Sequence, residues 1–159
     1  MSTLAQIKKE MQHLSNQELV DLCLRMAKYK KENKELLGYL LFDSTNEDQY
    51  VQTVNAEVDQ VFSEMNTYHP YLAKKTIRKA LRIATKYIKY SGNPNTEIQV
   101  LIHFCRNLNS CGISIRRYPV LVNLYDRQIK KIQTVIAKLH EDLQYDYNLE
   151  LEESGLLKD

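Results

Sequence analysis

Few residues in this sequence have the types and the spacing that catalysis or metal binding requires. Glu10 and His13 form a Glu-x-x-His pair, which is half of the site that di-iron helical bundles use. No other histidine has a glutamate three positions before it, so the second half of such a site is missing. His103 and Cys105 lie two positions apart, a spacing that points them to different faces of a helix. We therefore expect no metal and no other cofactor.

Thiol chemistry has one candidate among the three cysteines. An odd number of cysteines far apart in the chain is not a disulfide framework. Cys23 and Cys105 lie on expected apolar helix faces, so we expect both to be buried and unreactive. Cys111 lies in an expected loop, where it should be accessible and where nearby arginines could lower its pKa. A nucleophile also needs a partner base, and the sequence places none beside Cys111.

The strongest pattern in the sequence is cationic. Residues 65–96 contain seven lysines and arginines and no acid. On a helical wheel, the cations and the apolar residues of the stretch 74–92 fall on opposite sides. Six cations share an arc of about 100°, and we call them the basic stripe: Lys75, Arg78, Lys79, Arg82, Lys86 and Lys89. The opposite side carries Ile77, Ala80, Leu81, Ala84, Tyr87 and Ile88.

One interpretation of the basic stripe is a solvated helix face that acidic segments of the same chain partly neutralise. Residues 44–64 carry a net charge of −5 and residues 141–159 carry −6. Surface charge runs usually have this role. The net charge of the whole chain is only +2, which favours this interpretation, because dedicated nucleic-acid binders are commonly basic overall.

The other interpretation is a surface that follows a phosphate backbone. Arg116 and Arg117 could extend the basic stripe, and Tyr87 or Tyr90 could stack on bases. Cations combined with aromatic rings suit RNA or single strands better than a duplex groove. An acidic protein partner and an anionic membrane surface are further alternatives.

Apolar residues recur at helical spacing through almost the whole chain. This spacing predicts seven helices, over approximately residues 4–14, 16–34, 35–42, 45–65, 70–91, 95–108 and 119–145. Ser15 with Glu18, and Ser44 with Glu47, have the spacing of capping boxes. The third helix is apolar nearly all round, which is typical of a buried helix.

The seventh predicted helix, at 119–145, carries a long apolar stripe. Its members alternate at spacings of four and three: Tyr125, Ile129, Ile132, Ile136, Leu139 and Leu143. If the other helices leave part of this stripe uncovered, it could pair with its copy in a second chain and form a homodimer.

The sequence therefore predicts an all-α fold of six or seven antiparallel helices in hairpins, as a compact bundle or a short HEAT-like right-handed stack. Only four glycines and three prolines occur in 159 residues, too few for many short strands joined by tight turns. We expect a single helical domain over 1–145 and an acidic C-terminal tail over 146–159. No apolar run has the length of a signal peptide or a transmembrane segment, so we expect a reduced, cytoplasmic protein.

The stretch SNQELVDLCLRMAKYKKENKELLGYLLF, residues 15–42, resembles the N-terminal segment of small uncharacterised bacterial helical proteins. The basic helix resembles them more loosely. This resemblance implies an all-α fold in a family without an assigned activity, and it carries over no catalytic residue.

From these patterns we predict a non-catalytic helical protein-interaction or scaffold module whose partner is another protein. The alternative is a module that binds RNA or another single-stranded nucleic acid through the basic helix at residues 74–89. The third hypothesis is an unrecognised enzyme, since catalytic groups assembled from distant helices leave no local motif. An interaction module should expose an apolar patch or groove, and a nucleic-acid binder should join its basic helix to Arg116 and Arg117 in one positive surface. An enzyme should instead have a closed pocket with convergent polar groups.

Overall fold

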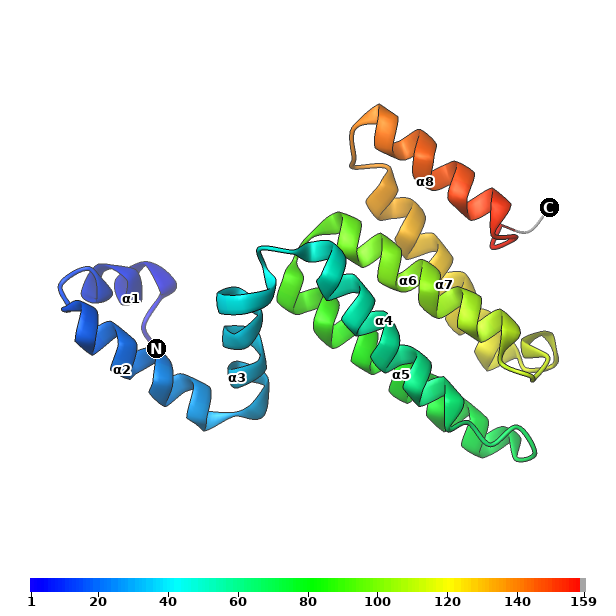
Figure 1. The fold of residues 1–159 in the computed structure, drawn as a ribbon, viewed down its shortest axis with the longest axis horizontal. Coiled ribbons are helices and arrows are strands. Elements are labelled where there is room, and N and C mark those ends of the chain that lie inside the picture. The colour runs from blue at the N-terminus through cyan, green and yellow to red at the C-terminus, as the bar shows by residue number, and fades with distance from the viewer. Residues whose placement is uncertain (158–159) are drawn as a thin grey trace. The chain divides into compact units, whose positions relative to one another are not determined.

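The structure, a computed structural model, describes residues 1–157, and these residues form eight α-helices and no strand (Figure 1). The all-α class predicted from the sequence is confirmed. The helices are α1 (Leu4–Met11), α2 (Asn16–Tyr29), α3 (Lys31–Gly38), α4 (Glu47–Ser63), α5 (Pro70–Ser91), α6 (Pro94–Ser110), α7 (Pro119–Ile136) and α8 (Glu141–Glu153). A π-helical turn, η1 (Tyr39–Asp43), follows α3, and a short 3-10 helix, η2 (Ile115–Arg117), precedes α7.

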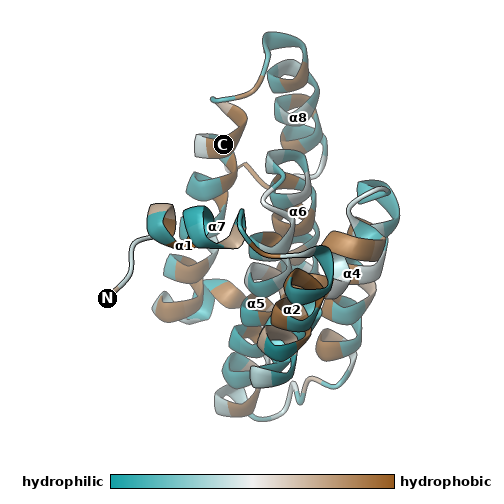
Figure 2. Cartoon of the chain, turned by 90° about the vertical axis from the view of Figure 1, so that its left-hand side faces the viewer, coloured by the Kyte–Doolittle hydropathy of each residue, from teal (hydrophilic) through white to brown (hydrophobic). Residues whose placement is uncertain are grey.

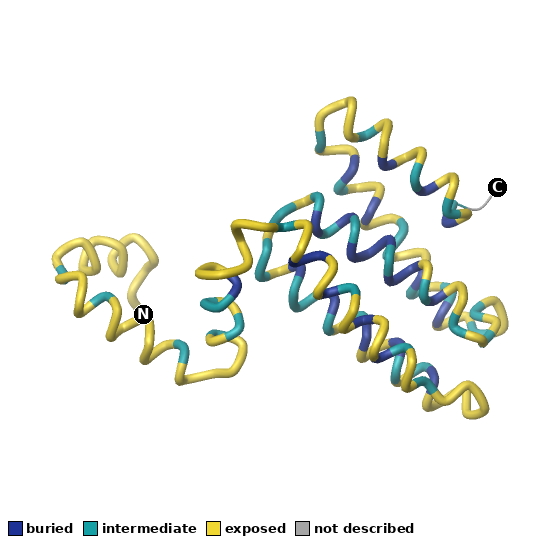
Figure 3. Tube along the Cα trace, viewed as in Figure 1, coloured by how far each residue is buried: buried dark blue, intermediate teal, exposed yellow. Residues whose placement is uncertain are grey.

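The chain divides into two compact units, an N-terminal unit of residues 1–43 and a C-terminal unit that begins at Ser44. The sequence predicts a single domain over 1–145 with an acidic tail after it. The two units differ in how they bury their apolar residues. In Figure 3 the buried positions are concentrated in the C-terminal unit, whereas α1 and α2 are almost entirely exposed.

The C-terminal unit is built around α6. This helix contacts α4, α5 and α7, while α8 packs on α7. Its buried residues occupy most of the circumference of the helix, because three neighbours pack on it: Thr96, Ile98, Val100, Leu101, Ile102, Phe104, Cys105 and Leu108. A central helix with three neighbours makes this unit a bundle rather than a linear stack of hairpins.

Local signals explain several helix ends in this unit. Pro70, Pro94 and Pro119 each occupy the first turn of a helix, where the missing N–H of proline has no intrahelical partner to lose. Gly92 ends α5 with φ of 64°, in the left-handed region that glycine enters without steric penalty.

The helix expected over 119–145 is instead two helices, so a continuous helix there is wrong. The chain leaves the helical conformation at His140, whose φ of −61° and ψ of 148° are extended and whose side chain accepts a hydrogen bond from the N–H of Asp142. The Gln144 side chain donates to the carbonyl of Leu139 at 2.7 Å. No glycine or proline lies between residues 137 and 142, and the apolar spacing continues across this segment. Neither signal in the sequence therefore indicates the break.

Most of the apolar stripe of that predicted helix is packed within the C-terminal unit. Tyr125, Ile132 and Ile136 are buried. The Tyr125 hydroxyl donates to the carbonyl of Leu156 at 2.8 Å, and Leu151 and Leu156 are buried too. The segment expected to be an acidic tail is thus packed as far as residue 157, and little of the stripe remains for a homodimer.

The N-terminal unit has well-capped helices. The Ser15 hydroxyl accepts from the N–H of Glu18 at 3.2 Å, and the Glu18 carboxylate accepts from the N–H of Ser15 at 2.7 Å. The predicted capping box is therefore confirmed, and the hydrogen bond from Ser15 lowers the pKa of Glu18. The second predicted box is wrong, since Asn46 rather than Ser44 caps α4.

Candidate functional site

The N-terminal unit exposes most of its large apolar side chains. Among the described residues, thirteen exposed large apolar residues lie within the first 43 positions and seven lie in the rest of the chain. Helices α1, α2 and α3 contain no buried residue. Apolar residues recur along α2 in Figure 2, where they are coloured brown. The expectation that residues 35–42 form a buried helix is wrong, because Leu40 and Phe42 are 55% and 76% exposed.

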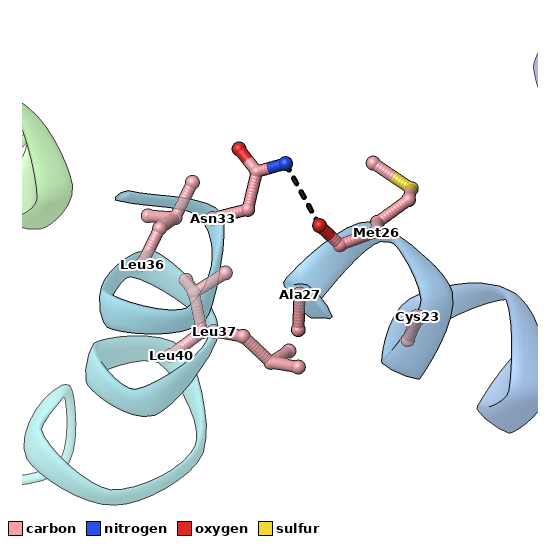
Figure 4. Close-up of a pocket in the computed structure, with 7 residues that line it drawn as sticks. All are labelled: Cys23, Met26, Ala27, Asn33, Leu36, Leu37 and Leu40. Carbon is pink, nitrogen blue, oxygen red and sulfur yellow. Dashed lines mark hydrogen bonds between the residues drawn. The ribbon is translucent and has the colours of Figure 1, made fainter. Parts of the chain in front are cut away.

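A groove of about 160 Å³ runs between α2 and α3 (Figure 4). Its walls are almost wholly apolar and consist of Cys23, Met26, Ala27, Asn33, Leu36, Leu37 and Leu40. The one polar side chain, Asn33, donates to the carbonyl of Met26 at 2.9 Å. This hydrogen bond ties the start of α3 to the C-terminal part of α2.

A second groove of about 290 Å³ lies between α1 and α2, and Cys23 and Met26 line both grooves. The two grooves therefore form one surface across the three helices. We call this surface the N-terminal apolar face: Ile7, Met11, Leu22, Cys23, Met26, Leu36, Leu37 and Leu40.

Cations surround the turn between α2 and α3. Lys28, Lys30, Lys31 and Lys34 lie within seven residues of each other. Lys31 approaches Glu35 at 3.6 Å, whereas the other three form no ion pair with any residue that the structure describes. With Glu32 and Glu35 counted, residues 28–35 carry a net charge of +2, so the turn beside the α2–α3 groove is positively charged.

Most of the basic stripe of α5 faces solvent, although Lys86 is half-buried over the Tyr87 ring. Lys75, Arg78, Arg82 and Lys89 are exposed and form neither an ion pair nor a side-chain hydrogen bond with any residue in 1–157. Lys79 lies 3.9 Å from Glu64, and both side chains are at least half exposed. Such a pair contributes little to stability, because water screens it. Beneath the stripe, the apolar side of α5 is packed into the core, with Ile77, Ala80, Ala84 and Ile88 buried.

Acids that were expected to neutralise the stripe have other partners. The Glu47 carboxylate accepts hydrogen bonds from Ser91 at 2.8 Å and from the buried Thr96 at 2.5 Å. These bonds tie the start of α4 to the junction between α5 and α6.

Two further acids pair with residues of α6. Asp59 contacts His103 at 2.6 Å and accepts from Asn107 at 2.7 Å. From the C-terminal acidic segment, Glu150 pairs with Arg106 at 3.1 Å. These acids hold α4 and α8 against α6 rather than covering the stripe of α5.

The two arginines predicted to extend the stripe lie on η2, where both are exposed. The start of α5 contacts the residue that follows η2, since the Lys74 ammonium lies 4.2 Å from the centre of the Tyr118 ring. Tyr118 directly follows Arg117, so η2 lies beside the N-terminal half of α5.

The tyrosines predicted to stack on bases are packed against each other instead. The rings of Tyr87 and Tyr90 lie edge to face at 5.9 Å, and Tyr87 makes the same kind of contact with Tyr50 at 6.3 Å. The Tyr87 hydroxyl also donates to Glu57 at 2.8 Å. A different tyrosine, Tyr71, is 76% exposed. It lies four residues before Lys75 and falls within the arc of the basic stripe, a signal that sequence reasoning missed.

The cysteines only partly match their predictions. Cys105 is buried, as predicted, but Cys23 is exposed and Cys111 is half-buried. The prediction for Cys23 is wrong because the apolar side of α2 is not covered. The Cys111 thiol donates to the carbonyl of Leu108 at 3.1 Å. Within residues 1–157 no three histidine, cysteine or acidic side chains lie close enough to hold a metal ion.

Comparisons with protein-family models, with curated proteins and with solved structures found no match for this chain. No helix among the described residues is both long enough and apolar enough to cross a membrane.

The three thiols should react with a thiol reagent at very different rates. We expect Cys23 to react rapidly in the native protein, Cys111 more slowly, and Cys105 only after unfolding. Ellman's reagent applied to the native chain measures these rates. A Cys23→Ser variant should lack the fast phase, and a fast phase that persists in this variant would contradict the assignment.

Stability at alkaline pH should depend on Cys105. Burial raises the pKa of its thiol to about 12, whereas the pKa of an unfolded thiol is about 8.5. Between these values the unfolded chain binds fewer protons than the folded one, so stability is full below about pH 8.5 and falls as pH rises. Between about pH 8 and pH 10, wild type should lose about 2 kcal/mol more unfolding free energy than Cys105→Ala. Urea unfolding at both pH values measures this, and equal losses would contradict the prediction.

Proposed function

We propose that this chain is a protein-interaction module and that its N-terminal apolar face binds an amphipathic helix of a partner protein. The observation that carries this proposal is the absence of any buried residue in α1, α2 and α3, although these helices are rich in leucine and methionine. A contiguous apolar surface of this kind, with polar residues around it, is typical of a site for another protein.

Small size adds to this argument. A unit of 43 residues buries too little apolar surface to gain much stability from its own core. Each leucine or methionine that becomes fully buried contributes about 1.5–3 kcal/mol. A partner that covered Met26, Leu36 and Leu40 would therefore supply the burial that the unit lacks.

The groove between α2 and α3 suits a helix as occupant. Two helices joined by a tight turn present ridges and grooves into which the apolar stripe of a third helix fits. Since Lys28, Lys30 and Lys34 are unpaired among the described residues, acids beside the apolar stripe of the partner would complement the groove. The partner is thus expected to be an amphipathic helix with acidic flanks.

A designed peptide tests the proposal. The probe is a fluorescent helix of about 18 residues, or five turns, with leucines at helical spacing and glutamates on the flanks. A peptide of the same composition in scrambled order is its control, and fluorescence anisotropy with the full chain gives both affinities. We expect the ordered peptide to bind and Met26→Glu together with Leu40→Glu to weaken it at least about tenfold.

A matched variant separates the groove from general surface effects. Leu24 is 47% exposed on the same helix and lines neither groove, so Leu24→Glu should leave the affinity unchanged. Equal binding of the scrambled peptide, or equal loss in Leu24→Glu, would overturn the proposal. Sedimentation of the free chain shows whether a second copy is the occupant instead, since such a dimer would dissociate in the Met26→Glu, Leu40→Glu variant.

A further inference from the structure

A second surface, on the C-terminal unit, has a different chemistry. We propose that the basic stripe of α5, with Tyr71 at its N-terminal end and η2 beside it, binds single-stranded nucleic acid. This surface shares no residue with the N-terminal apolar face, so the inference does not depend on the proposed function.

The geometry of the stripe fits a chain of phosphates. Apart from the adjacent Arg78 and Lys79, its cations recur every three or four residues, which corresponds to about 5 Å along the helix axis. From Lys75 to Lys89 the stripe extends about 21 Å at 1.5 Å per residue. A row of this length can contact several successive phosphates of one strand, as the grooves of single-strand binding proteins do.

Four of the six cations of the stripe are available to a ligand. Lys75, Arg78, Arg82 and Lys89 have no ion pair with any described residue. Like charges at this spacing repel one another within the helix, and anionic phosphates would relieve that repulsion. Lys79 would need only to exchange the half-exposed Glu64, at 3.9 Å, for a phosphate.

Aromatic rings are placed where bases would lie. Tyr71 is 76% exposed and lies one turn before Lys75, in line with the stripe. Tyr118 lies under the Lys74 ammonium at 4.2 Å, beside the exposed Arg116 and Arg117. Bases of a single strand are free to stack on such rings, whereas those of a duplex are not.

A membrane surface fits less well. Helices that lie in the lipid interface bury their apolar side among the acyl chains. The apolar side of α5 is instead committed to the protein core through Ile77, Ala80, Ala84 and Ile88. An acidic protein would match the charges but would leave the alignment of Tyr71 without a role.

Fluorescence anisotropy of the full chain with a labelled uridine oligonucleotide, about 12 nucleotides long, tests the proposal. We expect binding that weakens with salt, with a log–log slope near −3 for four phosphate contacts at about −0.7 each. Arg78→Glu together with Arg82→Glu should lower the affinity at least about tenfold and make the slope shallower. Tyr71→Ala should weaken binding about fivefold or more without changing the slope, and Tyr71→Phe should restore it.

A charge-matched control distinguishes the stripe from the overall charge. Lys130 and Lys138 are exposed on and just after α7, and neither has an ion pair with a described residue. Reversing both to glutamate changes the net charge as much as the double arginine variant does, and we expect nearly unchanged binding. An equal loss of affinity in this control would show that binding depends only on net charge, and it would overturn the proposal.

Other ligands give further outcomes that oppose it. Tighter binding to polyglutamate, or to vesicles containing phosphatidylserine, would assign the stripe to an acidic protein or a membrane. Binding that is absent at low salt would overturn the proposal outright. A double arginine variant that loses stability and no affinity would do the same, because it would show that the stripe serves only the fold.

Discussion

Replacing Phe104 by alanine should lower the free energy of unfolding by about 3–5 kcal/mol. This side chain is fully buried on α6, and its ring packs on that of Phe62 with 5.8 Å between the ring centres. Truncation removes the buried ring and leaves a cavity that the three neighbouring helices can fill only in part. Urea unfolding followed by circular dichroism measures the loss.

Phe42 provides the matched control for this substitution. Its side chain is 76% exposed, so Phe42→Ala should change the free energy of unfolding by no more than about 0.5 kcal/mol. Comparable losses in the two variants would mean that α6 is not the centre of the core. They would also mean that the apolar residues at the end of the N-terminal unit are buried in solution.

The two units should differ strongly in stability when each is produced alone. We expect residues 44–159 produced alone to unfold cooperatively within a few degrees of the full chain, because the buried core lies almost wholly in that unit. Residues 1–43 produced alone should be only partly helical, since short helices without burial are marginal in water. Thermal melts followed by circular dichroism test both fragments.

The contrary result would be as informative. If removing residues 1–43 lowered the melting temperature of the rest by about ten degrees or more, the N-terminal unit would contribute to the core. Its apolar face would then have an occupant within the same chain, and the proposed protein partner would lose its site.

Local chemistry made much of the fold predictable. Pro70, Pro94 and Pro119 begin helices where the sequence placed helix starts, and Gly92 ends α5. Each of these residues acts through its own backbone, so no knowledge of the rest of the structure is required. The division between α7 and α8 depends instead on tertiary packing, and it escaped prediction because the apolar spacing continues across it.

The candidate surfaces were predictable to different degrees. Charge patterning alone identified the basic stripe, since the helical spacing within one segment is enough to place its cations on one side. Cys23 was misassigned because helical spacing shows which residues share a face but cannot show whether another helix covers that face. Glu47 was misassigned for a similar reason. Its spacing from Ser44 predicted a capping box, but its carboxylate accepts hydrogen bonds from Ser91 and Thr96, 44 and 49 positions further along the chain, and such distant partners cannot be read from local spacing.

The reaction rate of Cys23 with and without the acidic amphipathic peptide tests the central claim most directly, because this thiol lies where the two apolar grooves meet. In the free chain the thiol should react rapidly. With the peptide at about ten times its dissociation constant, the rate should fall about tenfold, since only about one chain in eleven remains unoccupied. A Cys23 that reacts slowly in the free chain, or equally fast with the peptide bound, would contradict the account.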